Sequence, residues 1–268
     1  MATISVPTAQ PARRWTLVRK GLTLSIGVVA ALLTVGWAGL QIAPEPFAAL
    51  AQAQPPLTVV PLPAGLPAPV ERFYRLTYGE QIPLITTAVV RGRGTMRLGG
   101  VQVPIRFRFT HEAGQNFRQE MDLTWFGLPL FRGYDSYLDG HGRTNLPGAE
   151  EGAGFDQGSN VSVWASALNW FPAILVTDPR VRWEPVDAAT ALLVAPFGSG
   201  KEVLVVRFDP ASGKVQYVES MKYRAGADQQ ALWINGIWFE DGKPWTQLDV
   251  EDVRYNLDVH AHIRAEQP

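Results

Sequence analysis

The clearest pattern in the chain is an alternation of apolar and polar residues with a period of two. From Val101 to Phe109 every odd position is apolar and every even position is polar or proline. The same alternation occurs in residues 116–125 and again in residues 253–260. A period of two places successive side chains on opposite faces of a strand, so these segments are predicted to be half-buried antiparallel strands.

A pair of glycines at residues 99–100 predicts a two-residue hairpin turn within this pattern. The turn sets Leu98 opposite Val101 and Gly92 opposite Phe107, so that the apolar faces of the two strands coincide. Glycines opposite bulky side chains indicate a sharply curved sheet.

The next connection, around residues 112–115, leaves two registers open. Arg106 lies opposite Glu120 in one register and opposite Arg118 in the other. Opposite charges favour the pairing of Arg106 with Glu120. Pro104 cannot donate a hydrogen bond to a neighbouring strand, so we expect a β-bulge at this residue.

Further hairpin turns are predicted at residues 139–140, 209–213 and 241–242, where Asp-Gly pairs or an Asp-Pro start occur. One segment, residues 155–175, has helical spacing instead. Its apolar positions are Val161, Trp164, Ala165, Leu168 and Phe171. The predicted fold is therefore mainly β (α+β), with a strongly curved antiparallel sheet or open barrel wrapped around one internal helix.

An uncharged apolar stretch from Gly21 to Ala43 dominates the N-terminal part of the chain. Its 23 residues span about 34 Å as a helix, more than a bilayer core of about 30 Å. Four basic residues precede it, and the next basic residue is Arg72. This asymmetry predicts a single-pass transmembrane helix at 21–43 in the cell membrane, with a cytoplasmic leader at 1–20 and the domain outside.

A cleaved signal peptide is the alternative, and it makes the protein secreted. Ala49-Leu50-Ala51 and Ala51-Gln52-Ala53 both resemble cleavage sites. The apolar stretch is longer than the about 7 to 15 residues of a signal peptide, and the basic leader is long. The anchor is favoured over the signal peptide, and both stay open.

Residues 44–69 are rich in proline, which favours extended chain over helix or sheet. We expect a linker there that lifts an extracytoplasmic domain, residues 70–268, off the membrane. The chain after Ala43 carries 20 basic and 25 acidic residues, a formal net charge of −5. This balance gives no electrostatic basis for binding nucleic acid. The absence of cysteine excludes disulfides, a cysteine nucleophile and cysteine-ligated metals.

Candidate chemistry is sparse in this sequence. His260 and His262 share a face of the predicted C-terminal strand at a spacing that suits zinc or copper, but a solvated strand edge is favoured. Asp135, Asp139 and His141 gather at one turn, which recruits such residues for backbone reasons alone. No serine-hydrolase, zinc-protease or phosphate-loop motif occurs. We therefore predict no metal, no cofactor and no catalytic residue, and we do not expect an enzyme.

The strand and helix region carries a heavy load of aromatic side chains. In one interpretation they form an ordinary core. In the other, a sheet too wide for one helix to fill leaves an apolar cleft for a lipid or hydrophobic small molecule. The residues predicted to line this cleft are Trp125, Trp164, Leu168, Phe171, Trp183 and Trp233.

Three stretches of the chain resemble a family of bacterial membrane-anchored proteins to which no activity is assigned. They are LPAPVERFYRLTYG, FPAILVTDPRVRWEPVD, and LLVAPF followed by VVRFDPASGKVQYVESMKYR. The resemblance covers roughly residues 65 to 260, and the residues that carry it are Phe171, Pro172, Trp183, Asp187, Phe208, Asp209 and Gly213. It implies no catalytic residues. The expected shape also resembles the open-barrel carriers of periplasmic lipoprotein sorting, and such a likeness does not define function.

Two functions remain open at this point. The first is a membrane-anchored extracytoplasmic domain that binds an apolar ligand or lipid-like envelope component in a concave cleft. The second is a structural or protein-interaction module of the cell envelope with a filled core and no ligand. A lipid that copurifies with the domain distinguishes the first from the second.

Overall fold

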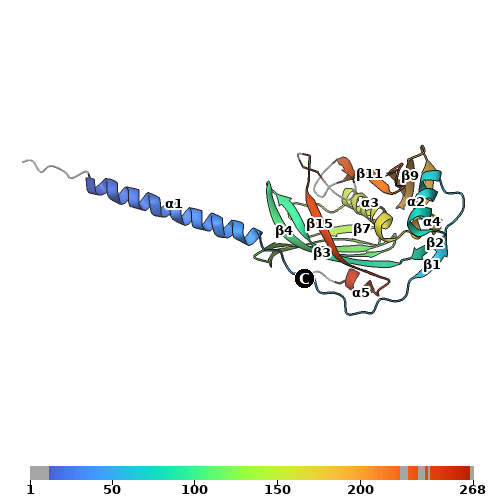
Figure 1. Ribbon diagram of the computed structural model, residues 1–268, viewed down its shortest axis with the longest axis horizontal. Helices are drawn as coiled ribbons and strands as arrows, with labels where there is room; N and C mark the ends of the chain where they lie inside the picture. Colours follow the sequence, from blue (N-terminus) through green and yellow to red (C-terminus); the bar gives the residue numbers. More distant parts are fainter. Residues whose placement is uncertain (1–11, 224–228, 235–238, 241, 266–268) are drawn as a thin grey trace, which may run out of the picture.

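The computed structural model describes residues 12–223, 229–234, 239–240 and 242–265 of the chain. A long helix, α1 (Ala12–Leu40), projects from one side of a β-rich body (Figure 1). In the described residues, two large antiparallel sheets, two two-stranded sheets and several helices make up the body. The fold is therefore mainly β with an apolar N-terminal helix, as the sequence predicts.

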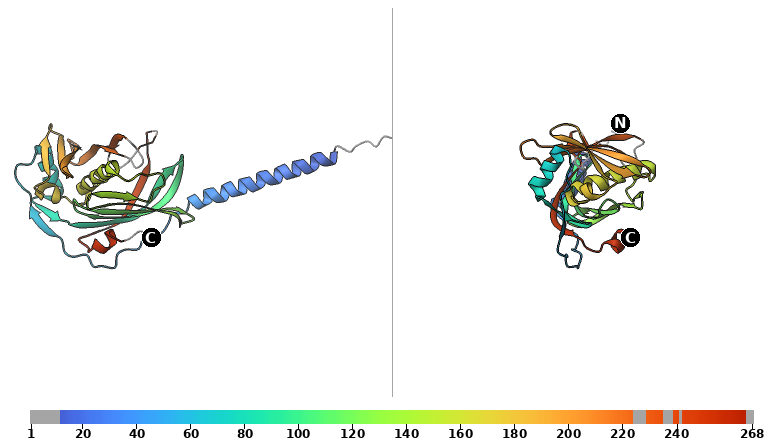
Figure 2. Two further views of the ribbon diagram at one scale, coloured as in Figure 1. Left: turned by 180° about the vertical axis from the view of Figure 1, so that it is seen from behind. Right: turned by 90° about the vertical axis from the view of Figure 1, so that its right-hand side faces the viewer.

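The larger sheet has six strands in the order β15-β3-β4-β5-β6-β7. Consecutive hairpins connect β3 through β7, and β15 returns along the free edge of β3. The sheet is strongly curved, as both figures of the whole chain show (Figures 1 and 2). Its strands are β3 (Thr87–Leu98), β4 (Val101–Glu112), β5 (Phe117–Trp125), β6 (Leu128–Leu138), β7 (His141–Thr144) and β15 (Thr246–Tyr255).

The second sheet has the order β12-β11-β10-β9-β8. A helix, α3 (Ala153–Trp170), lies between the two sheets and packs against β6, β7, β9, β10 and β11 (Figure 1). The strands of this sheet are β8 (Arg182–Pro185), β9 (Thr190–Phe197), β10 (Gly200–Phe208), β11 (Val215–Tyr223) and β12 (Gln230–Ile234). The remaining elements are β1 (Thr58–Pro61), α2 (Ala68–Tyr78), β2 (Gln81–Leu84), α4 (Ile174–Thr177), β13 (Phe239–Glu240), β14 (Lys243–Pro244) and α5 (His260–Ile263).

The main core forms around α3, which contributes Val161, Trp164 and Leu168 to it. The second helix, α2, covers one end of this core, and the Tyr74 hydroxyl donates a 2.8 Å hydrogen bond to the Pro172 carbonyl oxygen after α3. A smaller apolar cluster lies on the other face of the six-stranded sheet, where Val89 meets Ile263 of α5. The six-stranded sheet is thus covered by α3 on its concave face and partly by C-terminal residues on its convex face.

The predicted open, curved sheet around an internal helix is confirmed, and it does not close into a barrel. The register of the first hairpin is also confirmed, with Leu98 opposite Val101 and Gly92 opposite Phe107. A side chain at Gly92 would overlap the carbonyl oxygen of Asp249. The glycine therefore lets β15 approach β3 closely, which is how it contributes to the curvature.

The predicted register of the second hairpin is wrong. Arg106 lies opposite Asp122, not Glu120, and Arg108 lies opposite Glu120. The turn is centred on Gly114, whose φ of 64° suits a residue without a side chain. The shift preserves the apolar face and still pairs opposite charges, so charge alone could not choose the register.

The predicted bulge at Pro104 is also wrong. The pairing of β3 with β4 continues through Pro104 opposite Thr95 without a register shift. The ladder between β4 and β5 ends at Ile105, so the missing N–H of the proline does not interrupt it. The bulge of this region lies instead between Leu123 and Thr124, where β5 pairs with β6.

Two segments, the C-terminal one and the expected linker 44–69, differ from their predicted conformation. The C-terminal strand ends at Tyr255, because Asn256 adopts a φ of 56° and the chain then turns into α5. Within the expected proline-rich linker 44–69, residues 58–61 form the strand β1, which pairs with β2. The predicted turn at residues 241–242 includes Asp241, which lies outside the described residues.

Candidate functional site

Four of the six candidate residues lie in the main core. Trp164 and Phe171 are each 1% exposed, and Leu168 and Trp233 are also buried. The indole N–H of Trp164 donates a 3.2 Å hydrogen bond to the Pro196 carbonyl oxygen on β9. These side chains therefore join α3 to the five-stranded sheet and are enclosed by protein.

Trp183 packs against the rim of the same core, and Trp125 lies elsewhere. Trp183 is partly buried, and its indole N–H donates a 2.9 Å hydrogen bond to the Leu175 carbonyl oxygen. Trp125, at the end of β5, donates its indole N–H to the Gly36 carbonyl oxygen of α1 at 3.0 Å. The structure therefore brings five candidates together and separates Trp125 from them.

A different apolar surface lies further along the concave face of the six-stranded sheet. The face is identified by Ala88 and Tyr137, which belong to the core around α3. At alternate positions beyond them, Leu248 of β15, Gly94 of β3 and Ile105 of β4 align as one cross-strand row. The row continues through Leu123 of β5 and Phe131 of β6.

The residues of this apolar surface are buried on β4 and more exposed on the strands to either side, most of all on β15. Ile105 and Phe107, in the middle of the sheet, are fully buried. Leu248 and Val250 on β15 are 37% and 48% exposed, and Met121 on β5 is partly exposed. We call these residues and the row above the concave apolar surface; its most exposed members lie on β15, and α3 packs against β6 and β7.

A polar cluster lies inside the fold between α3, β6 and β11. Lys222 places its Nζ atom 2.5 Å from the hydroxyl of Ser162 and 4.7 Å from the ring centre of Trp233. Asp135 projects from β6 onto the same concave face and carries a buried oxygen, Oδ1, without a hydrogen-bond partner. The cluster therefore combines a cation, a hydroxyl and a carboxyl group in a largely apolar interior.

Burial shifts both charged groups of this cluster toward their neutral forms. Burial lowers the pKa of Lys222 to about 8, although the nearby Asp135 opposes this shift. Burial raises the pKa of Asp135, although a hydrogen bond with Thr144 and the charge of Lys222 oppose it. Ser162 lies in the middle of α3, where backbone N–H groups are bonded within the helix, so it lacks the donors of an oxyanion hole.

The two metal-site candidates are not assembled by the fold. Asp139 and His141 lie at an exposed turn, whereas Asp135 of the same predicted group points inward. His260 and His262 lie in the short helix α5, not on a strand face. Across the described ranges, no three His, Asp or Glu side chains gather as metal ligands.

His262 instead belongs to a charged cluster on the convex face. Its Nε2 atom lies 3.3 Å from Oε2 of Glu120, which also pairs with Arg108. Burial by itself would raise the pKa of Glu120, but the combined hydrogen bonds and charges of His262 and Arg108 lower it to about 2. This carboxylate fastens α5 to the sheet.

Residues 44–54 run along this convex face instead of leading away from the body (Figures 1 and 2). The guanidinium groups of Arg106 and Arg108 lie 4.5 and 5.0 Å from the ring centre of Phe47. Arg91 donates a 2.7 Å hydrogen bond to the Phe47 carbonyl oxygen. Gln52 bonds both the backbone N–H and the carbonyl oxygen of Asp258. The segment is therefore held against the sheet along its length.

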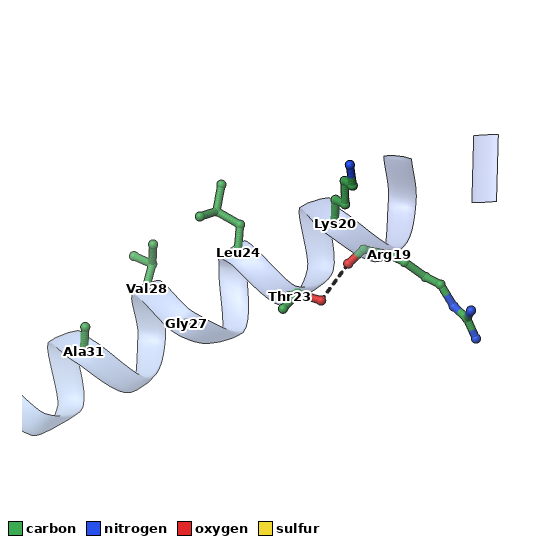
Figure 3. Close-up of a pocket in the computed structure, with 7 residues that line it drawn as sticks. All are labelled: Arg19, Lys20, Thr23, Leu24, Gly27, Val28 and Ala31. Atoms are coloured by element: carbon green, nitrogen blue, oxygen red, sulfur yellow. Dashed lines mark hydrogen bonds between the residues drawn. The ribbon is translucent and has the colours of Figure 1, made fainter. Parts of the chain in front are cut away.

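Two hollows lie on the surface of the described part of the protein. One lies on α1 alone, between turns from Arg19 to Ala31, where the side chains point outward (Figure 3). The other, of about 370 Å³, lies between β2, β3 and α4 with a mixed lining that includes Thr87 and Glu112. Neither hollow includes any of the six candidate residues.

The fold and this geometry define an open, curved antiparallel sheet that holds an internal helix and is joined to an apolar helix. Within α1, residues Arg19–Leu40 are long and apolar enough to cross a membrane. The chain belongs to the family of unknown function DUF6544, whose model matches residues 58–239. The match begins at β1, the first strand of the body.

Two solved structures show weak similarity to this chain. A DUF1329 family protein from Desulfovibrio piger is 10% identical, with a TM-score of 0.35, over 75% of this chain and 98% of that one. A domain named for outer membrane lipoprotein sorting, from Vibrio parahaemolyticus, is 11% identical, with a TM-score of 0.26, over 66% and 89%. No curated protein matches the chain significantly. We draw no functional conclusion from likenesses at this level.

Proposed function

We propose that this protein is a membrane-anchored, extracytoplasmic binding protein for an apolar or lipid-like molecule. The concave apolar surface is the observation that supports this proposal most strongly. Leu248 and Val250 expose 37% and 48% of their surface on the inner side of a curved sheet. Burying a large apolar side chain stabilises a complex by about 1.5–3 kcal/mol, so covering each of these two yields roughly half of that.

The polar cluster beside this surface suits a ligand that is apolar along most of its length and polar at one end. Lys222 carries a cationic group bound to Ser162, and Asp135 carries a buried oxygen, Oδ1, without a hydrogen-bond partner. These groups lie on the same inner side of the sheets as the concave apolar surface. A fatty acid or phospholipid has this distribution of polarity.

The orientation of the protein follows from its charges in this proposal. The apolar helix α1 spans the membrane, and the basic residues before it, including Arg19 and Lys20, stay in the cytoplasm. The domain then faces the outside of the cell membrane. A secreted form remains the outcome if the N-terminal segment is cleaved.

A structural or protein-interaction module is the second candidate. It is favoured by the burial of Trp164, Phe171 and Trp233, which fill the core instead of lining an opening. In this case the concave apolar surface contacts a partner protein and holds no small molecule.

Native mass spectrometry of the full chain, purified in lipid nanodiscs and released, tests the first function. We expect a copurifying lipid, and we expect Val250→Glu to abolish it. Val186→Glu is the matched control, because Val186 is 55% exposed beyond the end of β8 in the other sheet. Absence of lipid, together with no effect of added fatty acid or phospholipid on melting, would leave the interaction module as the better function.

A further inference from the structure

Two hairpin tips of the six-stranded sheet lie on the side of the body from which α1 leaves (Figures 1 and 2). The first tip comprises residues 98–101, between β3 and β4. The second comprises residues 125–130, between and including the ends of β5 and β6. Both β4 and β5 contact α1.

The side chains of these tips are apolar and exposed. Leu98 and Val101 on the first tip are 39% and 50% exposed. On the second tip, Phe126 is 38% exposed, and Leu128 and Leu130 are each 68% exposed. Hairpin turns in water carry polar residues, so a cluster of large apolar side chains at two adjacent turns indicates a contact surface.

The sequence of the second tip also indicates a contact surface. Residues 123–131 read LTWFGLPLF and contain no charged side chain. An exposed arginine, Arg132, follows directly. An aromatic and aliphatic run next to a basic residue is the composition found at the interface of a membrane with water.

The second tip is hydrogen-bonded to the C-terminal end of α1. The backbone N–H of Phe126 donates to the Gly39 carbonyl oxygen at 2.8 Å, one of the helix-end carbonyls that lack a partner within the helix. The indole N–H of Trp125 donates to the Gly36 carbonyl oxygen. A side chain at Gly39 would overlap the Trp125 ring, so glycine permits this close approach.

These bonds fix the depth of the tip relative to α1. Gly36 lies four residues before the end of the helix, which corresponds to about 6 Å along its axis. The interfacial layer on each side of a bilayer core is about 5–8 Å thick. If the end of α1 lies at the outer edge of the interfacial layer, Gly36 lies near its inner edge. The second tip, which is bonded to Gly36 and Gly39, is then at the level of this layer.

We propose that both hairpin tips insert into the interfacial layer of the leaflet from which α1 emerges. The occupant of this apolar surface is the lipid bilayer, because the tips adjoin the end of the one described helix that can cross it. This inference rests on the membrane anchor of the proposed function but not on ligand binding. The domain is thus held by three contacts with one leaflet, and its orientation is fixed.

Single cysteine labels test the inference, because the natural sequence contains no cysteine. The full chain is reconstituted in nanodiscs of phosphatidylethanolamine and phosphatidylglycerol with an environment-sensitive fluorophore at Leu128→Cys or at Val101→Cys. Val186→Cys is the matched control, since Val186 is apolar and 55% exposed but lies beyond the end of β8, a strand of the other sheet. Leu32→Cys reports on α1 itself.

We expect nitroxide lipids labelled near the headgroup to quench the labels at Leu128 and Val101 several-fold more than the label at Val186. Aqueous iodide should show the reverse order. Quenching at Leu32 with values at Leu128 and Val101 equal to that at Val186 would overturn the inference and leave the anchor intact. No lipid quenching at any position, Leu32 included, would overturn both the insertion of the tips and the membrane anchor.

Discussion

The indole N–H of Trp125 donates a hydrogen bond to the backbone carbonyl oxygen of Gly36, 3.0 Å away. This bond joins a strand of the domain to the last turns of α1. Together with the bond from Phe126 to Gly39, it places the end of β5 directly beside the end of the helix. The position of the domain relative to α1 can therefore be tested by single substitutions in the helix.

Gly39→Leu should separate the second hairpin tip from α1, because any side chain at this position overlaps Trp125. Spin labels at Val35→Cys and Leu128→Cys should show a longer and broader distance distribution in this variant. Gly27→Leu is the control, since nothing lies within 4 Å of its Cβ position. In both variants we expect the free energy of unfolding of the domain to change by less than about 0.5 kcal/mol. Identical distributions in the two variants would contradict the contact.

The register of β4 with β5 can be measured by a double-mutant cycle. Arg106 donates two hydrogen bonds, of 2.9 and 2.7 Å, to Oδ2 of Asp122, whose side chain is 3% exposed. We expect Arg106→Met and Asp122→Asn to show a coupling energy of about 1–3 kcal/mol in urea unfolding. The same cycle with Glu120→Gln should give less than about 0.5 kcal/mol. The opposite ranking would restore the register predicted from charge alone.

Trp164→Ala should destabilise the domain by about 3–5 kcal/mol, since it empties the volume of a buried indole. The side chain is 1% exposed and also loses its bond to Pro196. Leu130→Ala, at a residue 68% exposed, is the control and should change the free energy of unfolding by no more than about 0.5 kcal/mol. A loss at Trp164 below about 1 kcal/mol would show that this residue borders an opening and not a packed core.

Acid should destabilise the protein through His111. Burial lowers the pKa of this side chain, which faces Phe117 and Phe171, from its ordinary value of 6.5 to about 4. Between these values the unfolded chain binds a proton that the native state does not, so stability falls as pH decreases from 6.5 to 4. The full loss amounts to about 3 kcal/mol.

His111→Leu should remove this part of the pH dependence, measured as the free energy of unfolding at a series of pH values. The raised pKa of Asp135 acts in the opposite direction at low pH and is present in both proteins. His141→Leu, at an exposed histidine, is the matched control and should retain the loss. A parallel pH profile for His111→Leu and the unsubstituted chain would exclude His111 as the cause.

The sequence predicted the features that depend on neighbouring residues. The period of two gave the long strands, and the Gly99-Gly100 turn set their register because such a turn leaves only one alignment of the apolar faces. The register beyond Glu112 could not be predicted in the same way. It depends on which residue of the turn takes a positive φ, and only the structure identifies Gly114 as that residue.

The candidate site was harder to predict, because burial depends on residues far away in the chain. Trp164 and Trp233 are enclosed by a second sheet whose placement no local pattern reveals. The helix α2 was missed, although Val70, Phe73 and Tyr74 have helical spacing after a proline-rich start. Trp125 was grouped with the core aromatics, since nothing in the sequence alone shows that the end of β5 meets α1.

The attachment of residues 44–54 to the convex face limits how far the domain can move. An extended chain of 11 residues reaches about 36–40 Å, but here that length is bound to the sheet through Phe47 and Gln52. With α1 in a membrane, this attachment holds the domain close to the surface of that membrane. Under the proposed function, transfer of a bound lipid to a second membrane would require a separate soluble acceptor.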